Sequence, residues 1–330
     1  MRHHWLVITA IYFILACSTN LRAQEQSERA GRTEFPGTFR AISYNVQFLP
    51  AIARHTNKRS LPIYRARQIA EKMTAFDIIG LNETFDDEPR KIIHDHLKKE
   101  WGNNCPIIYG PDPRDGRFNG GLSLISRFPF VKTNAMIYKN FSSPLKYGVQ
   151  ADGFAAKGVL HARVILPEKN FGEKKRLDVF VTHFEARDGS LRRKQFDELA
   201  NFISKQISCD VDFILLGDLN TRGNAKYRAA PHSTYNQLFG VLTKAIPDHR
   251  LVDTWPTLHP DQDGGTKYQT KATGGPRIDY IIIGQAKKLD DQLNVKEVQV
   301  NPYLDEKVDA LSDHSAVEAT LKWNKLSPDG

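Results

Sequence analysis

The sequence predicts a single domain of mixed strands and helices, in the α/β or α+β class, and three observations lead to that prediction. The chain has 330 residues, of which 40% are hydrophobic and 25% charged, an ordinary composition for a protein large enough to bury its own core. From Phe39 onward, strand-like and helix-like segments alternate without a linker or a change in composition. No repeat of fixed period is present.

The first residues have the pattern of a secretory signal. A basic start at residues 2–4 precedes the apolar run Trp5–Ala16, which is too short to span a membrane as a stable helix, and polar residues follow it. Cleavage after Ala23 would leave residues 24–38 as a polar tether. Alternatively, the signal ends at residue 16 in a segment that resembles a bacterial lipobox, and Cys17 becomes lipidated. We therefore expect an exported protein, secreted or periplasmic, that is free or anchored through Cys17.

Apolar periodicity places the elements in the first half of the domain. Phe39–Leu49 is the first predicted strand, and Leu61–Ala75 is a predicted helix because its apolar side chains recur on one face. Phe76–Leu81 is an apolar run typical of a buried strand, and it ends on Asn82 and Glu83. Further apolar runs predict strands at Leu122–Ser126, Gly158–Leu166 and Leu177–Val181.

The second half continues the alternation up to Trp323, so we place one domain at residues 39–323 and a short tail at 324–330. Leu191–Ile207 is a predicted amphipathic helix that leads into the buried run Phe213–Leu216. Two later strands are predicted at Ile278–Ile283 and Ser315–Leu321. Polar and glycine-containing stretches predict loops at Asn224–Ser233 and Asp261–Gly275.

The run Phe213–Leu216 stops abruptly on Gly217, Asp218 and Asn220. An Asp and an Asn two residues apart at the end of a strand project from the same side of the backbone. The carboxyl ends of strands are the usual ligand sites of α/β sheets, and oxygen-rich side chains there suit a hard divalent cation or a phosphate better than zinc. The alternative is an ordinary turn after a strand.

Polar residues also occur at other predicted strand ends. Asn45, Glu83 and His183 lie at such ends, and each taken singly has a structural explanation: a bulge amide, a helix cap and a buried core histidine. Asp279 lies inside an apolar strand, where a charge is costly unless it is paired. The sequence offers two histidines as partners for it, His183 and His314. It is improbable that so many polar residues lie at predicted strand ends by coincidence.

This ordered set resembles the endonuclease/exonuclease/phosphatase superfamily, which has the DNase I-like fold. The motifs that carry the resemblance are Ser43-Tyr44-Asn45-Val46, Leu81-Asn82-Glu83, Thr182-His183, Gly217-Asp218-Leu219-Asn220, Ile278-Asp279-Tyr280 and Ser312-Asp313-His314. The resemblance runs from about Phe39 to Trp323. It implies a four-layer α/β/β/α sandwich and Mg²⁺-dependent cleavage of a phosphoester, with Mn²⁺ or Co²⁺ as substitutes for Mg²⁺.

Other segments are similar to neutral sphingomyelinases, both bacterial and animal. They are Leu81–Asp86, Asn119–Pro129, Ala156–Val159 and Ser312–Thr320. The spacing between Asp152 and Lys157 is similar to the Asp-Lys switch segment of the animal enzymes, and the alternative is an exposed pair without a role. One stretch departs from the family. Secreted bacterial sphingomyelinases carry an exposed aromatic hairpin before the last Ser-Asp-His, whereas Val300–Leu311 is short and offers only Tyr303.

The resemblance implies a metal site and a phosphate site. Glu83 is the expected direct ligand of Mg²⁺, Asn45 would help to hold the metal or a phosphate oxygen, and Asp313 would assist a second metal or buttress the site. Mg²⁺ usually keeps several waters, so few protein ligands are expected. Lys157 would bind phosphate once Asp152 releases or orders its segment.

The resemblance also implies the catalytic roles. His314 is the expected general base, and its ordinary pKa near neutrality suits that task. Asp279 would hold the imidazole of His314 in the right tautomer. Asp218 and Asn220 would position the attacking water and the phosphoryl oxygens, and His183 would stabilise the departing oxygen or the transition state.

The function expected from these residues is that of an exported Mg²⁺-dependent phosphodiesterase that hydrolyses sphingomyelin to ceramide and phosphocholine. We expect it to be a monomer that acts on a phospholipid at a membrane surface. The alternatives are an exported DNase I-like nuclease, favoured by 46 Lys and Arg against 38 Asp and Glu, a formal charge of +8, and a hydrolase of another phosphoester. In an exported protein Cys105 and Cys209 have the option of pairing as a disulfide.

Overall fold

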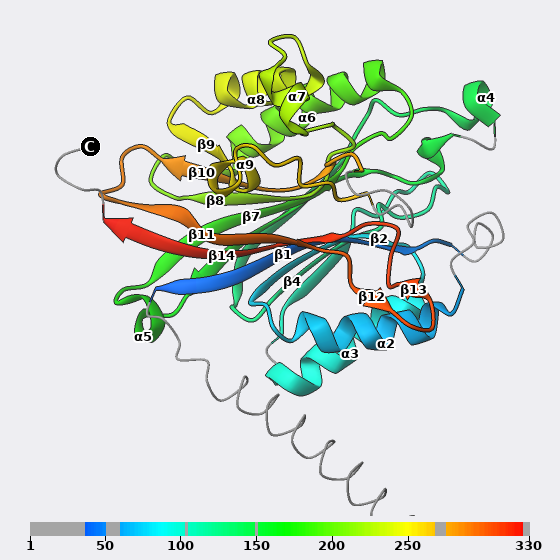
Figure 1. Cartoon of the computed structure of the whole chain (residues 1–330), viewed down its shortest axis with the longest axis horizontal. Coiled ribbons are helices and arrows are strands. Elements are labelled where there is room, and N and C mark those ends of the chain that lie inside the picture. The colour runs from blue at the N-terminus through cyan, green and yellow to red at the C-terminus, as the bar shows by residue number, and fades with distance from the viewer. Residues whose placement is uncertain (1–36, 51–59, 103–104, 149–150, 268–274, 326–330) are drawn as a thin grey trace, which may run out of the picture.

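The computed structural model describes residues 37–50, 60–102, 105–148, 151–267 and 275–325. It consists of two six-stranded mixed sheets packed face to face, with helices on both outer faces (Figure 1). The expected signal segment, Cys17, most of the tether and residues 326–330 of the tail lie outside the described residues, whereas residues 324 and 325 belong to β14. No helix in the described part of the chain is long and apolar enough to cross a membrane.

The first sheet has the strand order β11-β14-β1-β2-β4-β3. Only β1 and β2 are parallel to each other, and the other neighbours are antiparallel. Its strands are β1 (Thr38–Phe48), β2 (Ile78–Thr84), β3 (Ile107–Gly110), β4 (Leu122–Ser126), β11 (Asp291–Asn301) and β14 (Ala316–Lys325). A small separate hairpin, β12 (Leu304–Asp305) with β13 (Asp309–Ala310), precedes β14.

The second sheet has the order β5-β6-β7-β8-β10-β9, and its one parallel pair is β7 with β8. Its strands are β5 (Phe130–Ile137), β6 (Gly158–Leu166), β7 (Lys175–His183), β8 (Phe213–Asp218), β9 (His249–Asp253) and β10 (Asp279–Ala286). Each sheet therefore has a parallel pair of strands away from its edges. The carboxyl ends of these two pairs carry half of the residues expected in the site, namely Asn45, Glu83, His183, Asp218 and Asn220.

Helices form the two outer layers. α2 (Pro62–Met73) and α3 (Asp87–Trp101) cover the first sheet, and α6 (Gly189–Gln206) and α8 (Thr234–Ala245) cover the second (Figure 1). The shorter helices are α4 (Pro144–Tyr147), α5 (Glu168–Phe171), α7 (Ala225–Ala229), α9 (Thr254–Leu258) and the 3₁₀ turn η3 (Asp152–Phe154). The loop predicted at Asn224–Ser233 contains α7, so that prediction was wrong for those five residues.

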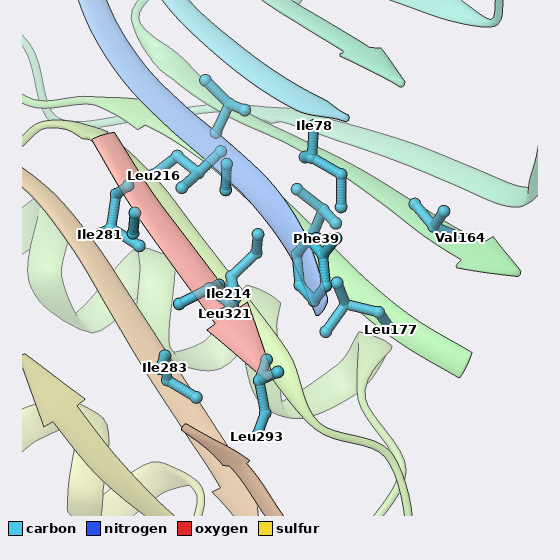
Figure 2. Packing of buried hydrophobic residues seen from close by; sticks show 14 of the residues in the cluster. Phe39, Ile78, Val164, Leu177, Ile214, Leu216, Ile281, Ile283, Leu293 and Leu321 are labelled. Atoms are coloured by element: carbon cyan, nitrogen blue, oxygen red, sulfur yellow. The ribbon is translucent and has the colours of Figure 1, made fainter. Parts of the chain in front are cut away.

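The core explains why the central strands are continuous apolar runs. In β8, Ile214 and Leu216 point into the core between the sheets, while Phe213 and Leu215 point toward the helices of the outer layer. Because side chains alternate along a strand, a strand covered on both faces must be apolar at every position. Figure 2 shows Ile214 and Leu216 together with side chains from both sheets, among them Phe39 of β1.

The two cysteines of the domain, Cys105 and Cys209, are both free, so the structure contradicts a disulfide between them. Cys105 is buried and packs with the apolar residues beneath α2 and α3. Burial raises the pKa of its thiol to about 11, which keeps it protonated near neutrality. Cys105 is therefore a small apolar core residue.

Candidate active site

Strand pairing brings the expected site residues together. In the first sheet, Asn45 of β1 pairs in register with Asn82 of β2, one residue before Glu83. In the second sheet, Asp218 of β8 lies between His183 of β7 and Asp279 of β10, and it pairs in register with both. The side chains then meet across the sheets, because the Nδ2 atom of Asn45 donates to Glu83 at 3.0 Å and to Asp218 at 3.2 Å.

The backbone near these residues takes conformations that few residues adopt. Gly217 has φ +145°, and a Cβ there would lie 1.9 Å from the carbonyl oxygen of Thr182, so only glycine allows this approach of β8 to β7. Glu83 and Asn220 have φ +58° and +45°, in the left-handed region that non-glycine residues seldom occupy. Such strain is concentrated at functional sites.

His314 and Asp279 form a buried pair. The Nδ1 atom of His314 lies 2.8 Å from the Oδ2 atom of Asp279. Burial alone would lower the pKa of His314, but the negative charge of Asp279, its hydrogen bond and Asp218 raise the pKa to about 9. The Nε2 atom of His314 faces the interior of the site, 3.7 Å from the Oδ2 atom of Asp218. The pair therefore turns the second imidazole nitrogen, Nε2, toward the site.

Asp218 lies at the centre of the site. Its Oδ2 atom is within 3.7 Å of the Nε2 atoms of both His183 and His314. Burial and the neighbouring Asp279 raise the pKa of Asp218 to about 7. The backbone N–H of Asn220 donates to Oδ1 of Asp218 at 2.9 Å, and the Asn220 side chain donates to the carbonyl of Phe184 at 3.0 Å. Asn220 thus fixes the orientation of Asp218.

Asn82 belongs to the motif Leu81-Asn82-Glu83, but the sequence did not predict a role for it in the site. Its side chain donates to the carbonyl of Thr182 at 2.8 Å and accepts from the backbone N–H of Asp218 at 3.2 Å. Asn82 therefore ties the first sheet to the second directly beside the site.

His183 lies on the opposite side of Asp218 from His314 and contacts a buried lysine. The Nζ atom of Lys157 is 3.1 Å from Nε2 of His183, donates to the carbonyl of Phe184 at 2.8 Å and contacts the carboxylate of Asp152. Burial and the charge of Lys157 hold the pKa of His183 well below its usual value, so the imidazole is neutral near pH 7. Lys157 is buried and Asp152 is partly exposed, so they are not an exposed pair.

Lys267 is a further residue of the site, and the sequence argument missed it. Its Nζ atom lies 3.0 Å from Nε2 of His314 and 2.5 Å from Oδ2 of Asp313. Buried Thr266 holds the position, because its hydroxyl accepts from the backbone of Asp279 at 3.1 Å and its carbonyl accepts from Ser315 at 2.6 Å. Lys267, in the described part of the loop expected at Asp261–Gly275, therefore places a positive charge in the site, and residues 268–274 of that loop lie outside the described residues.

The donor set fits a hard divalent cation. Burial and the nearby Asp313 raise the pKa of Glu83, because it is costly to ionise a buried carboxyl group beside another carboxylate. The Oδ1 atom of Asp279 is buried and has no hydrogen-bond partner among the described residues. Atoms of Asp218, Asp279 and His314 lie within 4.8 Å of one another. Because Asp279 is already hydrogen-bonded to His314, the carboxylates of Glu83 and Asp313 are better placed to bind a divalent cation.

The structure also tests the structural explanations that Asn45, Glu83 and His183 each had on their own, as a bulge amide, a helix cap and a core histidine. Asn45 does lie at a register irregularity of β1, and its Oδ1 atom accepts from the N–H of Gln47 at 3.2 Å, yet its amide nitrogen binds both carboxylates. Glu83 does not cap α3, because Asp86 holds that position. His183 is a buried histidine whose Nδ1 atom has no partner in the described part of the chain, and its other nitrogen faces the site.

Residues 42–314 match the sequence profile of the Endonuclease/Exonuclease/phosphatase family. The chain belongs to this family. That match confirms the family recognised from the strand-end motifs, a family of metal-dependent phosphodiesterases. It spans every residue of the site, from Asn45 to His314.

The chain resembles several family members of known sequence or structure. It is 24% identical to sphingomyelinase C of Listeria ivanovii over 271 residues, which cover 76% of this chain and 74% of that protein. The crystal structure of β toxin from Staphylococcus aureus with bound magnesium ions matches with a TM-score of 0.59 at 18% identity, covering 85% of this chain and 98% of the other. D. rerio TDP2 complexed with a single-strand DNA product also matches with a TM-score of 0.59 at 18% identity, covering 86% and 99%.

These structural matches confirm the four-layer sandwich of the DNase I-like fold. The chain is a sphingomyelinase C-like phosphodiesterase of the Endonuclease/Exonuclease/phosphatase family.

Proposed function

We propose that this protein is an exported Mg²⁺-dependent phosphodiesterase that hydrolyses sphingomyelin to ceramide and phosphocholine. The observation that carries the proposal is the pairing of His314 with Asp279 opposite Asp218, which leaves one imidazole nitrogen facing a group of carboxylates. Similarity to sphingomyelinase C over three quarters of the chain supports the choice of substrate. Export rests on the signal pattern of residues 1–23 alone.

Hydrolysis of a phosphodiester needs charge neutralisation, an activated water and assistance to the departing oxygen. Glu83, with Asn45 and Asp313, would hold Mg²⁺, which supplies charge neutralisation at the phosphoryl oxygens when it is bound. Lys267 provides a second positive charge at the same place through its contact with Asp313.

His314 takes the proton from the attacking water through Nε2. Asp279 accepts a hydrogen bond from Nδ1 of His314, which fixes the tautomer whose Nε2 is unprotonated and stabilises the imidazolium once the proton has arrived. Asp218, oriented by Asn220, places the water against the phosphorus. These residues form the nucleophilic side of the site.

Lys157 and His183 form the other side. Lys157 is a buried cation whose three N–H donors meet Asp152, His183 and the carbonyl of Phe184. Once Asp152 releases it, Lys157 would bind a phosphoryl oxygen or the departing oxygen as negative charge develops there. His183 is neutral and acts as a hydrogen-bonding partner. Asp152 holds the ammonium of Lys157 in place and, through its second contact with the N–H of Ala186, couples that position to the next loop.

The test is phosphocholine release from sphingomyelin vesicles with and without Mg²⁺, with plasmid DNA assayed in parallel. We expect Mg²⁺-dependent release by the natural protein and none by His314→Ala or Glu83→Ala, with both variants still folded by circular dichroism. Retained hydrolysis in either variant would contradict the assignment of these two residues. Absence of phosphocholine release by the natural protein would remove sphingomyelin as the substrate.

A DNA-cleaving activity is the second candidate. The structural match to D. rerio TDP2 with a DNA product and the formal charge of +8 favour it. If the plasmid is nicked and the vesicles stay intact, the activity is DNA cleavage, and the assignment of the site residues is unaffected. DNA binding should then weaken steeply with salt because counterions are released. If both substrates remain intact, a panel of other phosphoesters is the next assay.

A further inference from the structure

Three large apolar side chains are exposed close to one another beside the candidate site. Phe118, Leu145 and Phe154 are exposed to 43%, 100% and 42%. Phe118 and Phe154 are joined through the backbone, because the N–H of Phe118 donates to the carbonyl of Phe154 at 2.9 Å. Leu145 lies in α4, which packs next to η3 and its Phe154. We call these three residues the apolar rim.

The apolar rim is held by the same residues that hold the catalytic lysine. The N–H of Asp152, two residues before Phe154, donates to the hydroxyl of Ser142 at 2.9 Å, and the carboxylate of Asp152 contacts Lys157. Buried Glu185 accepts from the same Ser142 hydroxyl at 2.9 Å. In Figure 1, α4 lies toward the end of the sandwich where β14 begins. His314 lies at this end because it comes two residues before β14. A partner on the rim therefore lies beside the site.

Basic side chains accompany the apolar rim. Lys146 and Arg114 are exposed, whereas Arg117 stacks over the ring of Phe141 at 4.4 Å and is paired with Asp115 at 2.8 Å. Exposed apolar side chains that project from short turns and are flanked by cations match a bilayer surface, where the apolar groups reach the acyl region and the cations meet phosphates. A surface that binds another protein usually has a broader and flatter apolar centre than the apolar rim.

The hairpin β12–β13 is the rival location for membrane contact. It precedes Ser312, in the stretch Val300–Leu311 where only one aromatic residue is present. That residue, Tyr303, is buried and its hydroxyl donates to Glu318 at 2.6 Å, so it is unavailable for insertion. Leu304 is exposed to 63%, but it is the one exposed large apolar side chain of that hairpin among the described residues.

We propose that the apolar rim docks this protein on the surface of a phospholipid bilayer and so delivers a membrane lipid to the site. The proposal rests on the proposed lipid substrate, which it deepens by naming the contact surface. Insertion of Leu145 and Phe154 removes apolar area from water, which favours the bound state in proportion to the area buried. The position of the rim next to Lys157 sets the orientation in which a headgroup meets the site.

The test is cosedimentation with vesicles of phosphatidylcholine, phosphatidylserine and sphingomyelin in EDTA, so that binding is read without turnover. We expect the Leu145→Ser/Phe154→Ser variant to partition about tenfold more weakly than the natural protein, equivalent to ~1.4 kcal/mol. Val131→Ser is the matched control, because Val131 is 58% exposed at the far end of β5 and lies outside the rim. The control should bind like the natural protein. Leu304→Ser tests the rival hairpin.

Activity separates the docking proposal from the proposed function. The rim variant should lose hydrolysis of vesicles but keep hydrolysis of a monomeric short-chain substrate, since neither residue contacts the catalytic side chains. Equal vesicle binding by the rim variant and the natural protein overturns the proposal, as does a loss of binding only in Leu304→Ser. If vesicle binding depends on the rim but no lipid is hydrolysed, the docking proposal stands and the proposed lipid hydrolysis is wrong.

Discussion

The ammonium of Lys267 lies 3.0 Å from the Nε2 atom of His314, the nitrogen that faces the site. A lysine in this position places a fixed positive charge where a phosphoryl oxygen would approach the base, and it also pairs with Asp313 at 2.5 Å. The same side chain therefore has two effects. It favours the phosphate, and it competes with a divalent cation for a carboxylate.

Replacement of Lys267 should separate these two effects. We expect Lys267→Met to lower kcat by roughly 10²-fold, the usual loss when one group that stabilises transition-state charge is removed. Mg²⁺ binding, measured by isothermal titration calorimetry without substrate, should become about two- to fivefold tighter because Asp313 is released from its ion pair. Lys267→Arg keeps the charge and should keep the Mg²⁺ affinity of the natural protein. Weaker Mg²⁺ binding in Lys267→Met would show that the lysine supports the metal site.

The pair of Asp279 and His314 predicts a shift in pH dependence. Asp279 raises the pKa of His314, which stands at about 9, and the base works only when it is deprotonated. Asp279→Asn removes the negative charge, so the pKa of His314 should fall and the acid limb of kcat/KM against pH should move to lower pH. The plateau should drop by at least about 10²-fold because the imidazolium loses its partner. An unmoved limb would mean that another group controls it.

The contact between Asp152 and Lys157 predicts non-additive losses. Lys157→Met should lower kcat by roughly 10²-fold, since a buried positive charge beside His183 is removed. Asp152→Asn should cost less, because it loosens the lysine without removing it. In the double variant kcat should match that of Lys157→Met, as residues in direct contact are coupled. Losses that multiply in the double variant would show that Asp152 acts independently of Lys157.

The sequence predicted the interior strands of both sheets, and the strands it missed follow a physical rule. The missed strands of the two large sheets are β3, β5, β9 and β11, which form the four sheet edges. An edge strand pairs on one side only and is often exposed, as in β5, where Val131, Lys132 and Thr133 all face solvent. Its sequence therefore lacks the continuous apolar run that marks a strand covered on both faces.

A similar limit applies to the site. Residues at strand ends, such as Glu83, His183 and Asp218, are predictable because the end of an apolar run is visible in the sequence. Lys267 was missed because its place depends on hydrogen bonds that Thr266 makes with a strand twelve and more residues later. No local pattern in a loop of glycine, threonine and lysine records such a contact. A buried threonine hydroxyl that accepts from the backbone becomes visible only in three dimensions.

Asp178 provides a test of stability that is independent of the site. It is fully buried in β7 and binds His161 at 2.7 Å and Arg163 at 2.7 Å. Burial by itself would raise the pKa of Asp178, but the hydrogen bonds from His161 and Arg163 and their charges lower it below its ordinary value. A lowered pKa in the folded state contributes stability that is present above the ordinary pKa and is lost as pH falls through the folded-state value.

Asp178→Asn should therefore reduce the free energy of unfolding at pH 7 by about 3 kcal/mol, since it leaves a buried histidine and a partly buried arginine without their anion. The acid limb of stability should also become flatter in this variant, because the carboxylate that responds to acid is gone. The measurement is urea unfolding between pH 7 and pH 3. Asp210→Asn is the matched control, since Asp210 pairs with Arg176 at 2.7 Å but both are about half exposed, and its removal should change stability little. Equal losses in the two variants would mean that burial of the Asp178 cluster adds nothing to its strength.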